Sequence, residues 1–267
     1  MVNLNTGLTT YKMNILITGA NGYIAKALIE SLRKEHSIVC LSRSEADLTS
    51  LLEVNNFFNK HRTFDAVIHT AIIGGRRTKS EDGETIDQNI KMYYNLLENR
   101  NSFLRFISFG SGAELFSLNT PYGISKRLIA DSIKHKDKFT NIRIFGCFDH
   151  NEAEDRFIKG NIIRYINKEP IQIYENKQMD FFFMEDLVSI VKYCLAQENP
   201  SKEINCSYKE KHSLAQIAEI INCLGNYNVP IFLNGNIGKD YIGEFNLPIP
   251  YIGTEKGIQS VYNKLSA

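Results

Sequence analysis

The sequence lacks the features that would place it in a membrane or on a polyanion. No apolar run approaches the roughly 18 residues that a membrane span needs. The first twelve residues, Met1 to Lys12, are polar and have no apolar core of the kind found in a signal peptide. The formal net charge is only +1, so nothing argues for nucleic acid or an acidic membrane surface as a partner. We therefore expect a cytoplasmic protein that binds neither.

Cysteine is also scarce, and its arrangement is not that of a metal site. The chain has five cysteines in 267 residues, and none of them is spaced as metal ligands are. We expect buried or free thiols in a reducing compartment and no bound metal. There is no internal repeat and no low-complexity tract. The apolar share of 43% predicts a globular chain with a sizeable core, either one large α/β domain or one domain with a small lobe.

A short apolar run followed by two glycines is the first positive signal. Ile15 to Ile17 is typical of a buried strand. Gly19 follows where a tight turn needs a residue without a Cβ, and Gly22 follows where backbone must approach a ligand. A helix starting here would present unpaired N–H groups to a pyrophosphate. The residues expected to form this turn are Gly19, Asn21, Gly22, Tyr23 and Ile24. A plain strand–turn–helix remains the alternative.

The end of the second predicted strand, residues 37–41, bears on the choice of cofactor. In a nucleotide-binding fold this end meets the adenosine ribose, where an acidic residue would bind a free 2′-hydroxyl. No acidic residue stands at the tip, and Arg43 could face a 2′-phosphate. This favours NADP over NAD, although NAD remains possible and Arg43 could be a solvated surface residue. Asp47 could hold the adenine edge or cap the helix predicted over 51–61.

Two side chains that could move a proton share one helix face. A strand predicted over 103–109 is broken by Gly110-Ser111-Gly112, and Pro121 suits the first turn of a helix. Tyr122 and Lys126 are four residues apart on that helix. An ammonium beside a phenol favours the phenolate, so we expect a lowered pKa for Tyr122. Ser111 could hydrogen-bond the same substrate oxygen, whereas a surface Tyr–Lys pair is the alternative.

After residue 150 the alternation of strands and helices loosens. We expect a leader over 1–12, a Rossmann domain over 13–150 to which 184–200 returns, and a small lobe from 151–183 and 201–267. His69, at the apolar end of a strand over 64–71, is expected to be packed and hydrogen-bonded rather than catalytic. The later predicted elements are a strand over 141–148, a helix over 157–168, a strand over 171–174, a helix ending near 197, a strand over 204–207 and helices over 213–224 and 255–264.

Taken together, these motifs resemble the extended short-chain dehydrogenases/reductases, the NAD-dependent epimerase/dehydratase family. The motifs come in the family's order: Gly19-x-x-Gly22-x-x-Ala25, Asp65-x-Val-Ile-His-Thr-Ala71, Asn89, Ser111 and Tyr122-x-x-x-Lys126. Later segments, including Glu169-Pro-Ile-x-Ile-Tyr, resemble its sugar-nucleotide branch. The compact link after the second strand looks like that of GDP-fucose synthase and dTDP-4-dehydrorhamnose reductase. The similarity covers nearly the whole chain from Met13.

The resemblance implies a fold, a cofactor and roles for particular residues. The fold is a Rossmann-type, doubly wound parallel sheet with a small C-terminal substrate-binding lobe. Tyr122 would move a proton at the reacting oxygen, Lys126 would bind the nicotinamide ribose, and Ser111 would polarise the carbonyl. We choose Ser111 over Ser108 from its spacing to the position of the family's Tyr-Gly-like pair. The cofactor-binding residues beyond the turn would be Arg43, Asp47, Leu48, Thr70, Ala71, Asn89, Tyr122 and Lys126.

Departures from the family pattern narrow the expected reaction. Family dehydratases carry Asp-Glu after the serine or threonine, where this chain has Gly112-Ala113. The epimerising cysteine and histidine of GDP-fucose synthase would fall at Ala113 and near Phe157, neither of which takes a proton. We therefore expect an NADPH-dependent reductase of a nucleotide-linked 4-keto-deoxysugar that feeds deoxysugar or polysaccharide synthesis. A 4-epimerase with tightly bound NAD and a non-catalytic NADP-binding regulator are the alternatives.

The substrate side and the assembly are less determined by the sequence. The family's diphosphate-binding arginine and its asparagine after the sixth strand are Met179 and Gly146 here. The lost charge could be replaced by Lys177, Arg164 or Arg76. The partner expected beyond a nucleotide sugar is a second copy of the chain, because many relatives dimerise through the helices at 87–99 and 122–134. Tyr93 and Ile129 could serve that face or the core.

Overall fold

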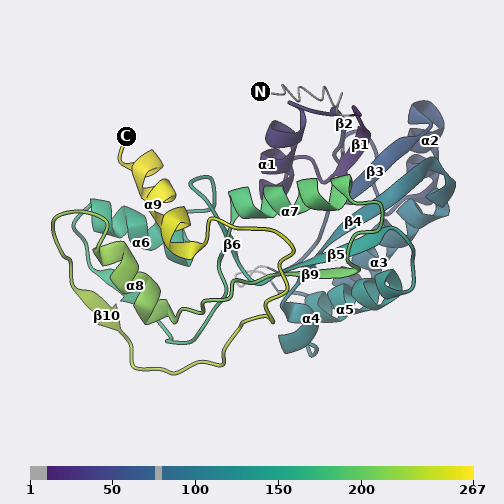
Figure 1. Ribbon diagram of the computed structural model, residues 1–267. Coiled ribbons are helices and arrows are strands. Elements are labelled where there is room, and N and C mark those ends of the chain that lie inside the picture. The colour runs from purple at the N-terminus through teal and green to yellow at the C-terminus, as the bar shows by residue number, and fades with distance from the viewer. Residues whose placement is uncertain (1–10, 76–79) are drawn as a thin grey trace, which may run out of the picture.

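A parallel six-stranded sheet forms the centre of the larger lobe (Figure 1). The computed structural model describes residues 11–75 and 80–267. The strand order is β2-β1-β3-β4-β5-β9, and every neighbouring pair is parallel. The strands are β1 (Asn14–Thr18), β2 (Ser37–Leu41), β3 (Phe64–His69), β4 (Phe103–Ser111), β5 (Phe139–Ile144) and β9 (Glu203–Cys206). The order reverses between β1 and β3, the place where ligands bind in such sheets.

Helices cover both faces of this sheet, so the expected doubly wound α/β fold is confirmed. One face carries α1 (Tyr23–Leu32) and α7 (Met184–Ala196), and the other carries α2 (Leu51–His61), α3 (Gly83–Glu98) and α5 (Pro121–Lys134). The two faces follow from the alternation within β1. Ile15 and Ile17 join the core beneath α1 and α7, and Leu16 joins the core on the opposite face.

Local sequence signals fix the ends of the helices around the sheet. Ser50 caps α2 by accepting a hydrogen bond from the Glu53 amide. Thr120 caps α5 in the same way, and Pro121 occupies the first turn, where its missing N–H costs nothing. These two caps place the starts of α2 and α5 where the sequence predicts them.

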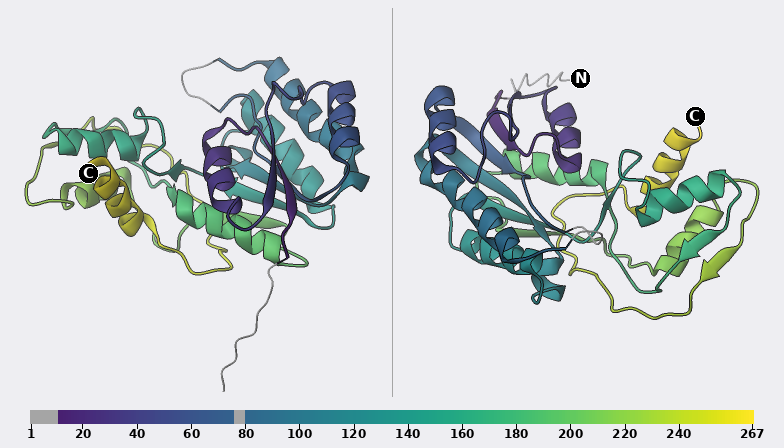
Figure 2. Two further views of the ribbon diagram at one scale, coloured as in Figure 1. Left: turned by 90° about the horizontal axis from the view of Figure 1, so that it is seen from above. Right: turned by 180° about the vertical axis from the view of Figure 1, so that it is seen from behind.

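A smaller lobe packs beside the sheet domain (Figure 2). Two short parallel pairs, β6–β8 and β7–β10, lie with three helices around one apolar cluster. The elements are β6 (Cys147–Phe148), β7 (Ile171–Ile173), β8 (Phe182–Phe183), β10 (Ile231–Leu233), α6 (Phe157–Ile166), α8 (Leu214–Asn222) and α9 (Thr254–Leu265). Two short elements, η1 (Arg100–Ser102) and α4 (Ala113–Phe116), flank β4. Within the described part of the chain no helix is long and apolar enough to cross a bilayer.

The structure corrects several sequence-based boundaries. The strand expected over 204–207 in the small lobe is β9, which pairs with β5 and completes the main sheet. The strand expected over 141–148 is two strands, because the chain leaves the sheet after Ile144 and β6 pairs with β8 instead. β4 continues through Ser111 rather than ending at Phe109. β10 was not predicted, since its short apolar run gains strand character only by pairing with β7.

Candidate functional site

The turn between β1 and α1 has the shape of a phosphate cradle. Gly19 has a φ of +65°, and a Cβ there would lie 2.8 Å from the Cα and the backbone N of Ala71. The Gly22 amide donates to the Gly19 carbonyl over 2.8 Å. The N-cap residue, Gly22, makes no side-chain cap of α1, and the first turn holds no acidic residue, so the first N–H groups of the helix are left for an anion. These features fit a dinucleotide pyrophosphate.

Neighbouring residues hold this turn against β3. The Thr70 hydroxyl donates to the Thr18 carbonyl over 2.6 Å, and the Ala71 amide donates to the Thr18 hydroxyl over 3.4 Å. The Tyr23 phenol donates to Asp149 over 2.7 Å and so ties the start of α1 to the segment that enters the small lobe. Asn21 is exposed at the tip of the turn, and Ile24 packs against the core.

The loop that follows β2 carries a basic side chain, Arg43, and an acidic one, Glu45. Arg43 is exposed and lies close enough to Asp47 to lower the pKa of that carboxyl, after the larger effect of hydrogen bonds from Thr49. Glu45, which the sequence analysis did not single out, folds back so that its carboxylate accepts from the Ser42 amide over 2.8 Å. Asp47 accepts from Thr49 and does not cap α2, so that alternative is wrong. Leu48 is buried at 6% exposure.

His69 and Asn89 are both buried and bonded to protein groups. His69 Nδ1 lies 2.8 Å from the Thr18 hydroxyl, and burial lowers the pKa of His69 to about 3. The packed histidine that the sequence predicts is therefore confirmed. The Asn89 amide pairs twice with the Ile73 backbone over 2.9 Å and donates to the Ser125 hydroxyl over 3.0 Å. Asn89 therefore holds the β3–α3 loop against α5.

Ser111, Tyr122 and Lys126 converge at the carboxyl end of β4. The Ser111 hydroxyl lies close enough to the Tyr122 phenol to lower the pKa of that phenol. Lys126 Nζ lies 5.8 Å from the centre of the Tyr122 ring and donates to the Phe109 carbonyl over 2.5 Å. The Ser111 hydroxyl oxygen accepts from the Ala113 amide over 3.2 Å. With its oxygen accepting from Ala113, the serine hydroxyl can still donate its own proton to another acceptor. Ser108, in contrast, is 2% exposed within the sheet.

Burial controls the charges of the two titratable members of this group. Burial raises the pKa of Tyr122 to about 12, opposed by the hydrogen bond from Ser111. Burial lowers the pKa of Lys126 to about 8, opposed by the charge of Glu114. The expected lowered pKa of Tyr122 is therefore wrong, because burial raises it and outweighs the opposing effects. At neutral pH the structure holds a neutral phenol beside an ammonium.

Residues from outside the expected motifs complete the walls of the site. Glycine at position 112 lets Tyr241 and Phe145 pack on the backbone, because a Cβ there would lie 2.6 Å from each ring. Tyr241 also contributes to the raised pKa of Tyr122. Gly75 packs on the Tyr122 ring in the same way, at 2.9 Å. Tyr241 comes from the tail after residue 225, whose weak sequence signals gave no reason to place it here.

Two of the basic side chains suggested for the substrate's diphosphate form ion pairs with acidic residues. Lys177 forms an ion pair with Glu175 over 3.0 Å, and Arg164 pairs with Glu169 over 3.6 Å. Arg76 lies outside the described residues. The five cysteines are all free thiols, as expected. Among the residues described, no group of three or more His, Cys, Asp or Glu could hold a metal ion.

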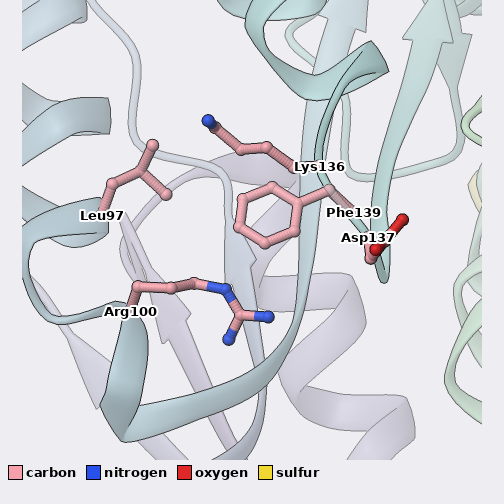
Figure 3. A pocket seen from close by; sticks show the side chains of 5 residues that line it. All are labelled: Leu97, Arg100, Lys136, Asp137 and Phe139. Carbon is pink, nitrogen blue, oxygen red and sulfur yellow. The ribbon is translucent and has the colours of Figure 1, made fainter.

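A pocket of about 310 Å³ lies at the opposite edge of the sheet (Figure 3). The Arg100 guanidinium lies 5.2 Å from the centres of the Phe103 and Phe139 rings, at the amino ends of β4 and β5. The pocket is lined by Leu97, Arg100, Lys136, Asp137 and Phe139. None of the candidate catalytic or cofactor-binding residues lines it, so it plays no part in the site described above.

Sequence comparisons with known proteins agree with this arrangement. The model of the NAD dependent epimerase/dehydratase family matches residues 15–207. A CDP-abequose synthase of Yersinia pseudotuberculosis is 23% identical over 247 residues, which cover 82% of this chain and 87% of the relative. A CDP-abequose synthase of Salmonella typhimurium is 26% identical over 214 residues, or 68% of this chain and 70% of the relative.

Solved structures share the fold over nearly the whole chain. The GDP-mannoheptose C4 reductase of Campylobacter jejuni with NADP bound superposes with a TM-score of 0.78 at 17% identity, covering 96% of this chain and 99% of that one. The Bordetella bronchiseptica enzyme WbmG in complex with NAD has a TM-score of 0.76 at 17% identity, covering 98% and 97%. At these identities the likeness shows the fold alone.

Proposed function

This chain belongs to the NAD dependent epimerase/dehydratase family, and on that premise we propose that it reduces a nucleotide-linked 4-keto-deoxysugar with NADPH. The observation that carries the proposal is the convergence of Ser111, Tyr122 and Lys126 at the carboxyl end of β4. The phosphate cradle lies at the same edge of the sheet, because all six strands run parallel. A reductase and CDP-abequose synthases among the similar proteins support the substrate class.

The chemistry asked of these residues is one proton transfer beside one hydride transfer. When bound, reduced nicotinamide would supply the hydride to the carbonyl carbon. Ser111 would donate a hydrogen bond to the carbonyl oxygen, where negative charge develops. Tyr122, whose pKa of about 12 keeps it protonated at neutral pH, would give that oxygen its proton. Lys126 would bind the nicotinamide ribose and stabilise the phenolate that remains.

The side chains after Ser111 support a reductase over a dehydratase. A dehydratase needs acid and base groups there, and Gly112 and Ala113 carry none. Glu114 does not replace them, since its side chain has no exposed surface and its carboxylate is bonded to Arg143 within the sheet domain. The proposed reaction needs only the hydride and the proton of Tyr122.

Arg43 supports NADPH, because an exposed guanidinium at the end of β2 can pair with a 2′-phosphate. A specific observation favours a second candidate, a nucleotide-sugar 4-epimerase with retained NAD. The Glu45 carboxylate is held at the same end of β2 by Ser42, where an acid could accept from a free 2′-hydroxyl. The cofactor that copurifies with the protein would discriminate between the two.

The test is a direct assay with matched variants. Purified protein is mixed with NADPH and 4-keto-6-deoxy sugars linked to CDP, GDP, UDP or dTDP, and the absorbance of reduced cofactor is followed. We expect turnover with at least one sugar and a loss of kcat of about 10²- to 10⁴-fold in Tyr122→Phe. Tyr94→Phe, a tyrosine exposed on α3, is the matched control and should retain activity. No turnover with any sugar, or full activity in Tyr122→Phe, would contradict the proposal.

We also infer that the protein forms a homodimer through α3 and α5. Tyr93 and Ile129 are buried in the core, at 0% and 4% exposure, so they do not form that face. Tyr94 and Leu128 instead point outward from the two helices, at 47% and 50% exposure. The product would serve deoxysugar or polysaccharide synthesis, and the expected compartment is the cytoplasm.

A further inference from the structure

Glu114 is a fully buried acid beside the candidate catalytic residues. Its side chain has no exposed surface, and its carboxylate accepts hydrogen bonds from three partners. The Ser111 amide donates over 2.8 Å, Arg143 Nε over 2.9 Å and Asn141 Nδ2 over 3.1 Å. Burial raises the pKa of Glu114, and the charge of Arg143 and the hydrogen bond from the Ser111 amide oppose that rise. All three partners are donors, which suits a carboxylate that accepts from each of them. A buried acid with three assigned donors is a built feature of the fold.

The strand that carries Ser111 is shaped to admit this carboxylate. A Cβ on Gly110 would lie 2.1 Å from Glu114 Oε1 and 2.7 Å from the Asn141 amide. Only glycine therefore fits at position 110 while Glu114 keeps its place. The two glycines that flank Ser111 thus have separate tasks, since Gly110 admits Glu114 and Gly112 admits Tyr241 and Phe145.

Glu114 acts on Ser111 through the backbone. Its carboxylate holds the Ser111 amide, and the Ala113 amide holds the Ser111 hydroxyl oxygen over 3.2 Å. With both positions fixed, the serine proton is the group left to bond the Tyr122 phenol or a substrate oxygen. The proposed mechanism depends on that proton, because it stabilises developing negative charge only when its donor is already in place.

Glu114 lies near a buried positive charge on another element. Lys126 Nζ donates to the carbonyl of Phe109, and the next residue, Gly110, packs directly on the Glu114 carboxylate. Lys126 is 8% exposed, and its side chain makes no ion pair shorter than 4 Å within the described residues. The charge of Glu114 opposes the effect of burial on Lys126. The titratable groups that face these residues come from several elements: Tyr122 and Lys126 on α5, Arg143 on β5, Glu203 on β9, neutral His69 on β3, Glu81 before α3 and Tyr241 from the C-terminal tail.

We propose that Glu114 is a positioning residue of this site, which fixes Ser111 through its amide and supplies the negative charge that balances the Lys126 ammonium. Glu203 provides the contrast. It lies on the far side of Arg143, at 2.6 Å, is one-third exposed and does not contact Ser111. If Glu114 only stabilised the fold, replacing it should have the same effect on the site as replacing Glu203.

The effect of the Glu114 charge on the pKa of Lys126 can be measured without any substrate. Lysine isotopically labelled at the ε-carbon is incorporated, the Lys126 resonance is assigned from Lys126→Met, and its titration is followed by NMR. In Glu114→Gln the Lys126 midpoint should fall from near 8 by about 1 pH unit, because the opposite charge is lost. In Glu203→Gln it should stay near the wild-type value. Equal midpoints in the two variants would overturn the proposal.

The kinetic test rests on the proposed function and is separable from the NMR result. In Glu114→Gln, kcat should fall about tenfold or more, and the loss of activity at high pH should begin at lower pH. The sign follows because loss of the negative charge favours deprotonation of both Lys126 and Tyr122. Glu203→Gln should keep the wild-type pH profile. If neither protein turns over any sugar, the proposed function fails while the NMR outcome still stands.

A conservative variant decides the question if Glu114→Gln does not fold. Glu114→Asp keeps the charge but withdraws the carboxylate by one methylene from the Ser111 amide. We expect a kcat reduced about tenfold with the Lys126 midpoint lowered only slightly. A folded Glu114→Asp protein with both wild-type kcat and a wild-type midpoint would overturn the proposal.

Discussion

At the scale of single residues, the proposed preference for NADPH over NADH rests on the side chains at the end of β2. Arg43 is exposed there and offers a guanidinium, whereas the Glu45 carboxylate is already engaged by the Ser42 amide and hydroxyl. A hydrogen-bonded acid can still accept from a ribose hydroxyl, but it would repel a 2′-phosphate. The proposed preference for NADPH therefore requires that Arg43 attracts the 2′-phosphate more strongly than Glu45 repels it. Cofactor kinetics can measure this difference.

Arg43→Ala should raise the KM for NADPH about tenfold or more and leave the KM for NADH nearly unchanged. The reason is that a charge-assisted hydrogen bond contributes about 1.5–3 kcal/mol, and each 1.4 kcal/mol is a factor of about ten. Steady-state kinetics with each cofactor measures both values. Arg33→Ala is the matched control, since Arg33 contacts the Cys40 thiol within β2 and does not belong to the loop that follows the strand. Equal increases in the KM values for NADPH and NADH in Arg43→Ala would show that Arg43 does not bind the 2′-phosphate.

Among the elements, the β1–α1 turn requires a glycine for both its backbone conformation and its packing. Gly19 combines a positive φ with the backbone of Ala71 at 2.8 Å from a Cβ, so moving a flexible side chain would relieve neither the strain nor this crowding. Gly83, the first residue of α3, is different, because a Cβ there would meet no atom within 4 Å. These two glycines therefore make a matched pair.

Gly19→Ala should lower the free energy of unfolding by about 2 kcal/mol or more. The left-handed conformation costs a non-glycine residue about 1–2 kcal/mol, and the clash with Ala71 adds to it. Gly83→Ala should instead be neutral or stabilise by up to about 1 kcal/mol, since alanine favours the helix and limits the unfolded chain. Urea unfolding measures both. A Gly19→Ala protein as stable as Gly83→Ala would show that the turn is not strained.

Across the whole molecule, the C-terminal tail joins the two lobes over the site. Lys211 pairs with Asp180 over 2.9 Å and also donates to the Gly243 carbonyl over 3.0 Å. Asp180 accepts in turn from the Gly243 amide over 2.7 Å. This buried network fixes the tail segment that brings Tyr241 against Gly112. The wall of the site next to Ser111 is therefore held from the small lobe.

The proposed dimer interface, the outer surfaces of α3 and α5, can be tested by placing a charge in it. Leu128→Asp should weaken a dimer at least about 100-fold, because an unpaired charge buried in an interface costs about 3 kcal/mol or more. Analytical ultracentrifugation should show a dimer for the wild type and a monomer for the variant. Leu104→Asp, also at an exposed leucine but on β4, should remain dimeric. A monomeric wild-type protein would contradict the inferred dimer.

The sequence alone determined the elements whose signals are local. The strand periodicity of β1 and β2, the caps of α2 and α5, the spacing of Gly19 and Gly22 and the i,i+4 relation of Tyr122 and Lys126 all lie within a few residues. From them followed the parallel sheet, the family and the three candidate catalytic residues. The resemblance to the family's motif selected Ser111 over Ser108, and in the structure Ser111 lies close enough to Tyr122 to lower the pKa of its phenol.

Only the tertiary structure decided the features that depend on distant partners. β9 joins the main sheet because the edge of β5 is open to it, and β10 forms only beside β7. The pKa of Tyr122 rises because residues from several elements bury it, whereas the sequence showed only Lys126 nearby. Tyr241 and Arg143 lie more than 20 residues from Ser111 along the chain, so no local pattern could bring them to the site. Burial and contact between distant segments are properties of the folded chain, and these decide how the catalytic groups are charged.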